Sequence, residues 1–237
     1  MGVTGESYWP HYFDLRAKYM DQHDFKNFQI MAELDLIQSG DVVVDIGANV
    51  GDYTKYFLSK LGGTGKVFSV ELDVDIFAYL QKTFDAPNLV LLNAAVCDKD
   101  GEVDYYVHNT YHQMNSISGG ADRTFRGKVK SLTLDTLLES VEHVSLLKID
   151  IEGAEILAID GMSETLKKVS VIFLENHNDE CWAKIFPILT ENGFTCYNIE
   201  TKKRADAEHP PYQSLCTTEP ERLRSYFKPS MFVEYAP

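Results

Sequence analysis

The chain has 237 residues, of which 44% are hydrophobic, and its 22 basic and 36 acidic side chains give a formal net charge of −14. This near-average composition excludes a disordered chain, and the length is typical of one α/β domain with appendages. The negative charge repels phosphate backbones, so nucleic acid is not expected as a partner. The four cysteines form no C-x-x-C pair, no apolar run is long enough to span a membrane, and the start lacks a signal-peptide pattern. We therefore expect reduced thiols in a soluble, cytoplasmic protein.

Residues 1–40 are predicted to form an N-terminal helical arm, and residues 41–237 one domain. Asp24 is placed to cap a helix, and Gly40 to stop it. The cluster of aromatic side chains before this helix is interpreted as packing, with a lid as an alternative. The apolar residues at helical spacing are Phe25, Phe28, Met31, Leu34 and Ile37, and the aromatic residues are Tyr8, Trp9, Tyr12 and Phe13.

From Asp41 onward, short β-rich runs alternate with amphipathic segments, which is typical of a mostly parallel sheet. Residues 95–107 interrupt this alternation and are predicted to form a hairpin with its turn at residues 98–101. A polar stretch without a clear period follows, at residues 108–128. The predicted strands are residues 42–46, 67–70, 89–92, 144–149 and 171–174, and the predicted helices lie near residues 53–61, 75–84 and 136–139 and start again at Ala154.

The first strand ends in a glycine-bearing turn that opens a helix, with Gly47 and Gly51 allowing a close backbone approach. Such a turn alone is equally consistent with a tight connection that binds nothing. Asp45 beside the turn would repel a pyrophosphate, whereas Glu71, 20 residues after Gly51, occupies the place of a ribose-binding acid. The nicotinamide and Walker glycine patterns are both absent. The turn therefore predicts a nucleoside ligand whose charge is not phosphate, for which S-adenosylmethionine is the best fit.

Residues 43–53 resemble the first motif of class I methyltransferases, and residues 147–155, Leu-Lys-Ile-Asp-Ile-Glu-Gly-Ala-Glu, resemble the signature of the FkbM family of methyltransferases. The similarity continues through residues 68–71, 93–95, 132–138 and 175–177, in the family's order. It implies a Rossmann-like, doubly wound, seven-stranded sheet with one antiparallel strand and helices on both faces. Residues 194–199 and 231–235 are the candidates for its terminal pair of strands.

The resemblance also implies that S-adenosylmethionine is the cofactor and S-adenosylhomocysteine the product. Asp45 is expected to receive the amino-acid part of the cofactor, and Glu71 its ribose. The expected cofactor-binding residues are Asp45, Gly47, Asn49, Gly51, Glu71, Leu72, Asn93, Ala94, Ala95 and Asp150.

Residues two apart on a strand share a face, so Lys148 and Asp150 are expected to point the same way, as are Glu175 and His177. His177 is the favoured base for removing the acceptor's proton, with Asp150 second. Lys148 either offsets the charge of a developing alkoxide or anchors Asp150. A structural ion pair between Lys148 and a carboxylate is the alternative to a catalytic role.

Weaker expectations concern the acceptor, for which His112, Ser116 and Glu175 are candidate contacts, and His112 is a further candidate base. Glu152 and Glu155 are expected to cap and charge the first turn of the following helix. Asp150, Glu175 and His177 could hold a divalent ion, but without a dense aspartate cluster no metal is expected. The remaining histidines, His11, His23, His143 and His209, are expected to be ordinary surface or helix residues, while His108 shares the polar stretch with His112.

The resemblance implies transfer of a methyl group to a hydroxyl, and the family's breadth favours a sugar, a glycan or a glycosylated natural product. The alternatives are a methyltransferase of a non-sugar small molecule, a catalytically silent binding module with the same fold and, least favoured, an NAD-dependent dehydrogenase. The chain is also a candidate for one domain of a larger glycan-building polypeptide.

Overall fold

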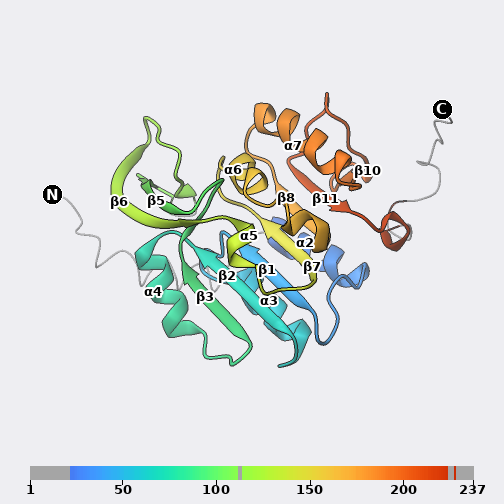
Figure 1. Cartoon of the computed structure of the whole chain (residues 1–237), viewed down its shortest axis with the longest axis horizontal. Coiled ribbons are helices and arrows are strands. Elements are labelled where there is room, and N and C mark those ends of the chain that lie inside the picture. Colours follow the sequence, from blue (N-terminus) through green and yellow to red (C-terminus); the bar gives the residue numbers. More distant parts are fainter. Residues whose placement is uncertain (1–21, 112–113, 224–226, 228–237) are drawn as a thin grey trace.

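The computed structural model describes residues 22–111, 114–223 and 227. The aromatic cluster before residue 22, His112 and the candidate strand at residues 231–235 lie outside these residues. The core is a sheet in the order β10-β9-β11-β8-β7-β1-β2-β3 (Figure 1). Its strands are β1 (Val42–Ile46), β2 (Lys66–Glu71), β3 (Leu89–Asn93), β7 (Val144–Ile149), β8 (Val169–Glu175), β9 (Thr195–Asn198), β10 (Lys203–Arg204) and β11 (Gln213–Thr217).

The predicted mostly parallel sheet is confirmed, with a difference at one edge. β3, β2, β1, β7 and β8 run parallel, whereas β11 is antiparallel to both β8 and β9. The two-residue β10 then pairs antiparallel with β9. The described sheet therefore has eight strands rather than seven, and two antiparallel strands rather than one.

Of the two segments predicted as the terminal pair of strands, residues 194–199 contain β9, whereas residues 231–235 lie outside the described residues. β9 pairs with β11 at residues 213–217. All five residues of β11 are buried although three of them are Gln, Ser and Thr. Their polar groups are satisfied inside the sheet; for example, the Thr217 hydroxyl donates a hydrogen bond to the Ser170 carbonyl at 3.0 Å. A buried strand with this composition lacks the apolar run by which the other strands were predicted.

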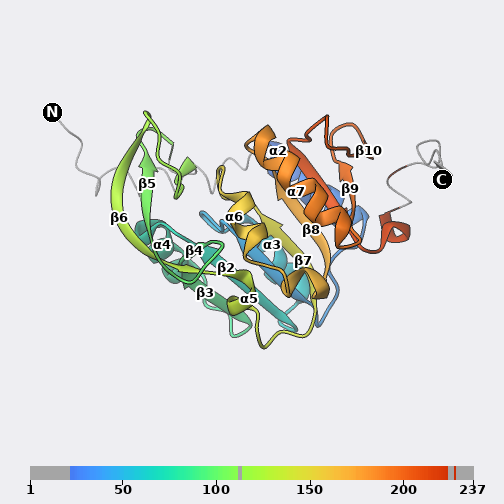
Figure 2. The same cartoon turned by 45° about the horizontal axis from the view of Figure 1, so that its top comes forward.

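Helices cover both faces of the sheet, as predicted (Figure 2). Val43 and Phe173 pack against α2 and α3 on one face, and Val44 and Leu147 pack against α6 and α7 on the other. The predicted Asp24 cap was wrong, because α2 already begins at Gln22, and this helix ends at Glu33, well before Gly40. The helices are α2 (Gln22–Glu33), α3 (Asp52–Leu61), α4 (Val74–Thr83), α5 (Leu134–Leu137), α6 (Glu155–Asp160) and α7 (Asp179–Glu191), with 3-10 turns at Thr165–Lys168 and Pro220–Leu223.

A second, three-stranded sheet stands beside the first at the carboxyl ends of β2 and β3 (Figure 1). It consists of β4 (Ala95–Val96), β5 (Gly101–His108) and β6 (Arg123–Leu132), in the order β4-β6-β5. The predicted hairpin between residues 95–97 and 103–107 was therefore wrong. β5 pairs antiparallel with β6, and β4 pairs parallel with β6. β6 lies partly in the polar stretch and was missed because half of its ten residues are exposed and only three are buried.

Cys196 and Cys216 lie opposite each other on β9 and β11 and form a disulfide, with their Cα atoms 3.9 Å apart. The expectation of four reduced thiols was therefore wrong, because strand pairing joins residues that are 20 positions apart in the sequence. Cys97 and Cys181 are free and buried. Among the described residues, none of the helices has the length and apolar character needed to cross a membrane.

Candidate active site

The carboxyl ends of β2, β1, β7 and β8 meet at one edge of the sheet, where open α/β folds bind their ligands. The turn after β1 closes tightly over this edge. Gly47 has φ +79°, and a Cβ atom there would lie 1.8 Å from the Asp150 carbonyl oxygen. Gly51, with φ +90°, would likewise press a Cβ against the Phe84 ring. Only glycine fits these two positions, so the turn after β1 is held directly against the end of β7.

Below this turn lies a buried ion network. The Lys148 ammonium donates to the Gly47 carbonyl at 3.0 Å and lies 3.4 Å from Asp45 Oδ1 and 3.3 Å from Asp150 Oδ2. The Thr54 hydroxyl donates to Asp45 Oδ2 at 2.8 Å. The expected shared face of Lys148 and Asp150 is thus confirmed. Asp45 is completely buried, so in this arrangement its side chain supports the turn from beneath, and its expected contact with a cofactor stays a prediction.

Glu71, at the end of β2, accepts hydrogen bonds from the backbone N–H groups of Asn49 and Asp73, both at 2.8 Å. Burial raises the pKa of Glu71 to about 7. Asn93 lies beside it and donates to the carbonyls of Glu71 and Leu72 at 2.8 and 3.0 Å. The three strand ends that carry the predicted cofactor residues are therefore tied together by hydrogen bonds.

A mostly apolar pocket, partly open to solvent, lies next to Glu71 between the ends of β1, β2 and β3. One wall comes from residues 115–118, which fold back over the crevice. Asn115 anchors this segment by donating to Asp73 Oδ2 at 2.9 Å, and Ser116 is fully buried within it. Ile117, within the segment expected to contact the cofactor or the acceptor, lines the pocket. The lining residues are Ile46, Gly47, Val70, Leu72, Ala94, Ala95, Val96, Ile117, Ile151 and Ala154.

On the far side of the turn, four carboxylates surround His177. Its Nδ1 lies 2.9 Å from Glu155 Oε1. Its Nε2 faces Glu175 Oε1 at 3.3 Å, Glu152 Oε2 at 3.5 Å and Asp150 Oδ1 at 3.9 Å. We call these five residues the His177 cluster. The side chains of Glu152, Glu175 and His177 are only 16–17% exposed and that of Glu155 not at all, so water screens their charges weakly.

The pKa values in the cluster reflect burial and mutual charge. Burial favours a neutral imidazole, but hydrogen bonds to Glu155 and Glu175 and the nearby charges of Glu152 and Asp150 raise the pKa of His177 to about 11. Burial raises the pKa of Asp150 to about 6 and that of Glu152 to about 7. Burial would also raise the pKa of Glu175, but the hydrogen bonds that it accepts lower it to about 2. The ring of His177 is therefore a cation at neutral pH in the ligand-free site.

Glu152 and Glu155 were predicted to cap and charge the first turn of the following helix, and only Glu152 differs from this prediction. Glu152 has φ +57°, which is rare for a residue with a side chain, and its carboxylate turns toward His177. The N-cap of α6 is Ala154, which makes no side-chain capping bond. Glu155 does lie in the first turn of α6, but its Oε1 accepts from the Gly153 N–H at 3.0 Å and contacts His177.

Tyr212 is a further residue of the site that sequence reasoning missed. Its hydroxyl donates a hydrogen bond to Glu175 Oε1, and its ring centroid lies 5.9 Å from that of His177. Gln213 donates to the other oxygen of Glu175 at 2.7 Å. Tyr212 directly precedes the unpredicted strand β11, so its sequence context carried no signal of this position.

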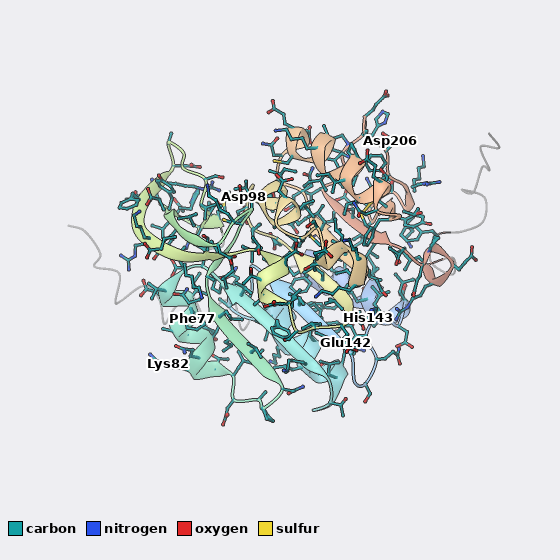
Figure 3. The ribbon with its side chains drawn as sticks, viewed as in Figure 1. Phe77, Lys82, Asp98, Glu142, His143 and Asp206 are labelled. Atoms are coloured by element: carbon teal, nitrogen blue, oxygen red, sulfur yellow. A yellow bond between two sulfur atoms is a disulfide. The ribbon has the colours of Figure 1, made fainter. Side chains whose placement is uncertain are left out.

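The other described histidines lie away from the cluster. His108 is buried and lies 3.2 Å from Asp122, while its Nδ1 accepts from two backbone N–H groups. His143, labelled in Figure 3, comes just before β7 and so lies at the opposite end of that strand from Asp150. His209 is exposed and hydrogen-bonded to Asp206, which is labelled in the same view. The expected surface position of His209 is thereby confirmed.

Known proteins similar to the chain are methyltransferases. It is 26% identical over 152 residues to the hexuronic acid methyltransferase AglP of Haloferax volcanii, a match covering 61% of this chain and 59% of that protein. It is 25% identical over 174 residues to the 2-O-methyltransferase NoeI of Sinorhizobium fredii, covering 65% of this chain and 71% of NoeI. A structure assigned as an rRNA methylase from Clostridium thermocellum shares the fold, with TM-score 0.50, 12% identity and coverage of 84% and 95%.

The family model for the Methyltransferase FkbM domain matches residues 45–196, which is more than half the chain. This segment starts at Asp45, before the glycine turn, and ends at Cys196 in β9, so it includes the whole His177 cluster. The chain therefore belongs to the FkbM family of S-adenosylmethionine-dependent methyltransferases, and S-adenosylmethionine is its methyl donor.

Proposed function

We propose that the chain is an O-methyltransferase that methylates a hydroxyl group of a sugar, a glycan or a glycosylated natural product. One observation carries the proposal: the apolar pocket beside Glu71 and the His177 cluster flank the same turn at the carboxyl edge of the sheet. The pocket suits a nucleoside, and the cluster suits an acceptor that must lose a proton. The name of NoeI supports a hydroxyl oxygen as that acceptor, and the name of AglP supports a sugar acid as the molecule that carries it.

The residues present fit S-adenosylmethionine. The apolar walls suit an adenine ring, and Glu71 at the end of β2 offers carboxylate oxygens to ribose hydroxyls. When bound, the cofactor supplies an activated methyl group on a positively charged sulfur. The carboxylates of the His177 cluster lie on the other side of the turn from the pocket and would favour the binding of such a cation. We propose that the cofactor contacts the residues expected from the sequence, which are Asp45, Gly47, Asn49, Gly51, Glu71, Leu72, Asn93, Ala94, Ala95 and Asp150.

The acceptor hydroxyl loses its proton as the methyl group is transferred, and a positioned base accelerates such a step by about 10²–10⁴-fold. We assign this role to Glu152 rather than to His177, because the carboxylates around His177 already keep its ring protonated. The backbone of Glu152 is held in a strained conformation that turns its carboxylate into the cluster. His177 and Asp150 then orient the acceptor, and Lys148 anchors Asp150.

The acceptor would lie between residues 115–118 on one side and Tyr212 on the other. Tyr212 is 46% exposed although its hydroxyl is engaged by Glu175, so its ring is available to stack on a sugar. We also propose that Glu175, Ser116 and His112 contact the acceptor, as expected from the sequence. We further propose that the domain spans residues 41–237, that the protein works in the cytoplasm and, from its charge of −14, that it does not act on nucleic acid.

The test combines binding and transfer. Titration calorimetry with S-adenosylhomocysteine measures the cofactor site. Mass spectrometry with trideuteromethyl-labelled cofactor then measures transfer to a panel of uronic acids, neutral oligosaccharides, non-sugar alcohols and RNA. We expect binding, and label on sugars only. Binding without transfer to any acceptor would favour the silent binding module, and label only on non-sugar alcohols or RNA would refute the sugar assignment.

A pair of variants tests the assignment of Glu152. Glu152→Gln keeps the shape of the side chain but removes its charge, so we expect kcat to fall by about 10²-fold or more with little change in S-adenosylhomocysteine affinity. Glu142→Gln is the matched control, because Glu142 is exposed and precedes β7 at the other end of that strand (Figure 3). Unchanged kcat in Glu152→Gln would refute the role of Glu152.

A further inference from the structure

We infer that Asp150, Glu175 and His177 form a binding site for a divalent cation, preferably Mn²⁺, coordinated by one oxygen of each carboxylate and by His177 Nε2. The sequence predicted no metal because it contains no dense aspartate cluster. The fold gathers the required ligands from the ends of two neighbouring strands, β7 and β8. The inference does not depend on which hydroxyl the protein methylates.

The ligand atoms lie close enough to share one ion. One atom from each of the three side chains lies within 4.8 Å of the others. His177 Nε2 is 3.3 Å from Glu175 Oε1 and 3.9 Å from Asp150 Oδ1. Metal–ligand bonds of about 2.1 Å place neighbouring ligands of an octahedron about 3 Å apart. Side-chain shifts of less than 1 Å therefore convert the present arrangement into a coordination site.

Glu155 provides a second observation that points to a metal. It is completely buried, and its Oε1 lies 2.9 Å from His177 Nδ1. Histidine ligands of metals commonly donate their other ring N–H to such a carboxylate, which fixes the tautomer and aims the free nitrogen at the ion. Here the ring is aimed so that Nε2 faces the other three carboxylates. The second oxygen of Glu155 is buried and has no hydrogen-bond partner among the described residues.

The local charge also favours an added cation. Among the described residues, five carboxylate side chains, those of the His177 cluster and of Asp45, gather around the ammonium of Lys148 and the ring of His177. Buried carboxylates are costly when they exceed their counter-charges. A divalent ion offsets this excess. On binding, the Nε2–H bond of His177 breaks, its proton passes to water and a bond from Nε2 to the metal forms, with no change of oxidation state.

The donor set determines the preferred metal. Two carboxylates and one imidazole, with no thiolate, suit Mn²⁺ and then Mg²⁺. Asp150 is the most exposed of the three ligands, at 26% of its side chain, so the open positions of the ion face the crevice. Glu152 stays outside the ligand set and remains the carboxylate that receives the proton.

The experiment titrates Mn²⁺ into the chelator-treated chain of 237 residues and follows the electron paramagnetic resonance signal of free Mn²⁺. We expect one ion bound per chain, and an affinity at least 10-fold weaker in Glu175→Gln and in His177→Gln. Glu142→Gln should bind Mn²⁺ like the wild type. Circular dichroism checks that each variant is folded. If one variant is unfolded, the Mn²⁺ affinity of the other variant tests the site.

Mn²⁺ binding and methyl transfer are measured separately, so the metal site and the proposed function can be refuted independently. A wild-type chain that binds S-adenosylhomocysteine and methylates sugars but leaves all Mn²⁺ free would overturn the metal site alone. Equal Mn²⁺ affinity in the wild type and in either folded variant would overturn it as well. One bound Mn²⁺ that is weakened by the variants, in a chain that transfers no methyl group, would support the metal site and contradict the proposed function.

Discussion

The substitution Gly47→Ala tests whether the turn after β1 must be held against the end of β7 for the cofactor to bind. A Cβ at Gly47 would lie 1.8 Å from the Asp150 carbonyl oxygen, whereas an ordinary contact needs at least 3.4 Å, so the two segments must separate by about 1.6 Å. That shift stretches the hydrogen bond from Lys148 to the Gly47 carbonyl, now 3.0 Å long. Misplacement by about 1 Å can cost 10²-fold in a positioned site.

Gly63→Ala is the matched control. Gly63 has φ +84°, close to the +79° of Gly47, but a Cβ there would meet nothing within 4 Å. Both variants therefore carry the left-handed backbone cost of about 1–2 kcal/mol, and only Gly47→Ala adds a clash. Urea denaturation should show the smaller loss of stability in Gly63→Ala. Calorimetry should show S-adenosylhomocysteine affinity unchanged in Gly63→Ala and at least 10-fold weaker in Gly47→Ala, and equal affinities would refute the reasoning.

Two further predictions concern buried charges. Burial raises the pKa of Glu71 from 4.5 to about 7, so the native state keeps a proton that the unfolded chain has released. The contribution of Glu71 to stability therefore falls as pH rises from 4.5 to 7. The affinity for S-adenosylhomocysteine should rise between pH 6 and 8, because the ribose-binding carboxylate ionises over that range. Calorimetry across this pH range measures the affinity, and an identical pH profile in Glu71→Gln would contradict the prediction. Lys148→Met leaves Asp45 and Asp150 without their shared buried cation and should cost about 3–5 kcal/mol in urea denaturation. The added substitution Asp45→Asn should recover part of that loss, and no recovery would argue against the ion network.

Sequence patterns predicted the centre of the fold because its strands are buried on both faces. β1, β7 and β8 are runs of mostly apolar residues with few polar interruptions. Such short, nearly continuous apolar runs are typical of parallel strands that are covered on both faces. The same reasoning failed for β11 and β6. β11 buries hydroxyl and amide groups that are satisfied inside the sheet, and half of the residues of β6 are exposed. Neither strand therefore has an apolar run.

Some residues of the candidate site could also be placed from the sequence, and others could not. Spacing along one strand correctly placed Lys148 beside Asp150, because side chains two apart share a face. It could not show that Glu152 turns away from α6, since this depends on a backbone conformation with φ +57°. Nor could it show that Tyr212, just before β11, reaches Glu175. A cluster assembled from the ends of several strands depends on which strands pair and in which register. The periodicity of a sequence does not reveal this pairing.

The central claim is that a carboxylate cluster at this sheet edge removes the proton of a sugar hydroxyl while its oxygen is methylated. The most direct measurement uses S-adenosylmethionine with a ¹³C-labelled methyl group and the sugar acceptors of the panel, followed by ¹³C nuclear magnetic resonance of the product. The account predicts one labelled methyl resonance, coupled through an ether oxygen to a ring carbon of the sugar, and its loss in Glu152→Gln. A labelled methyl group on nitrogen, sulfur or carbon, or an ester methyl on a uronic acid carboxylate, would contradict it.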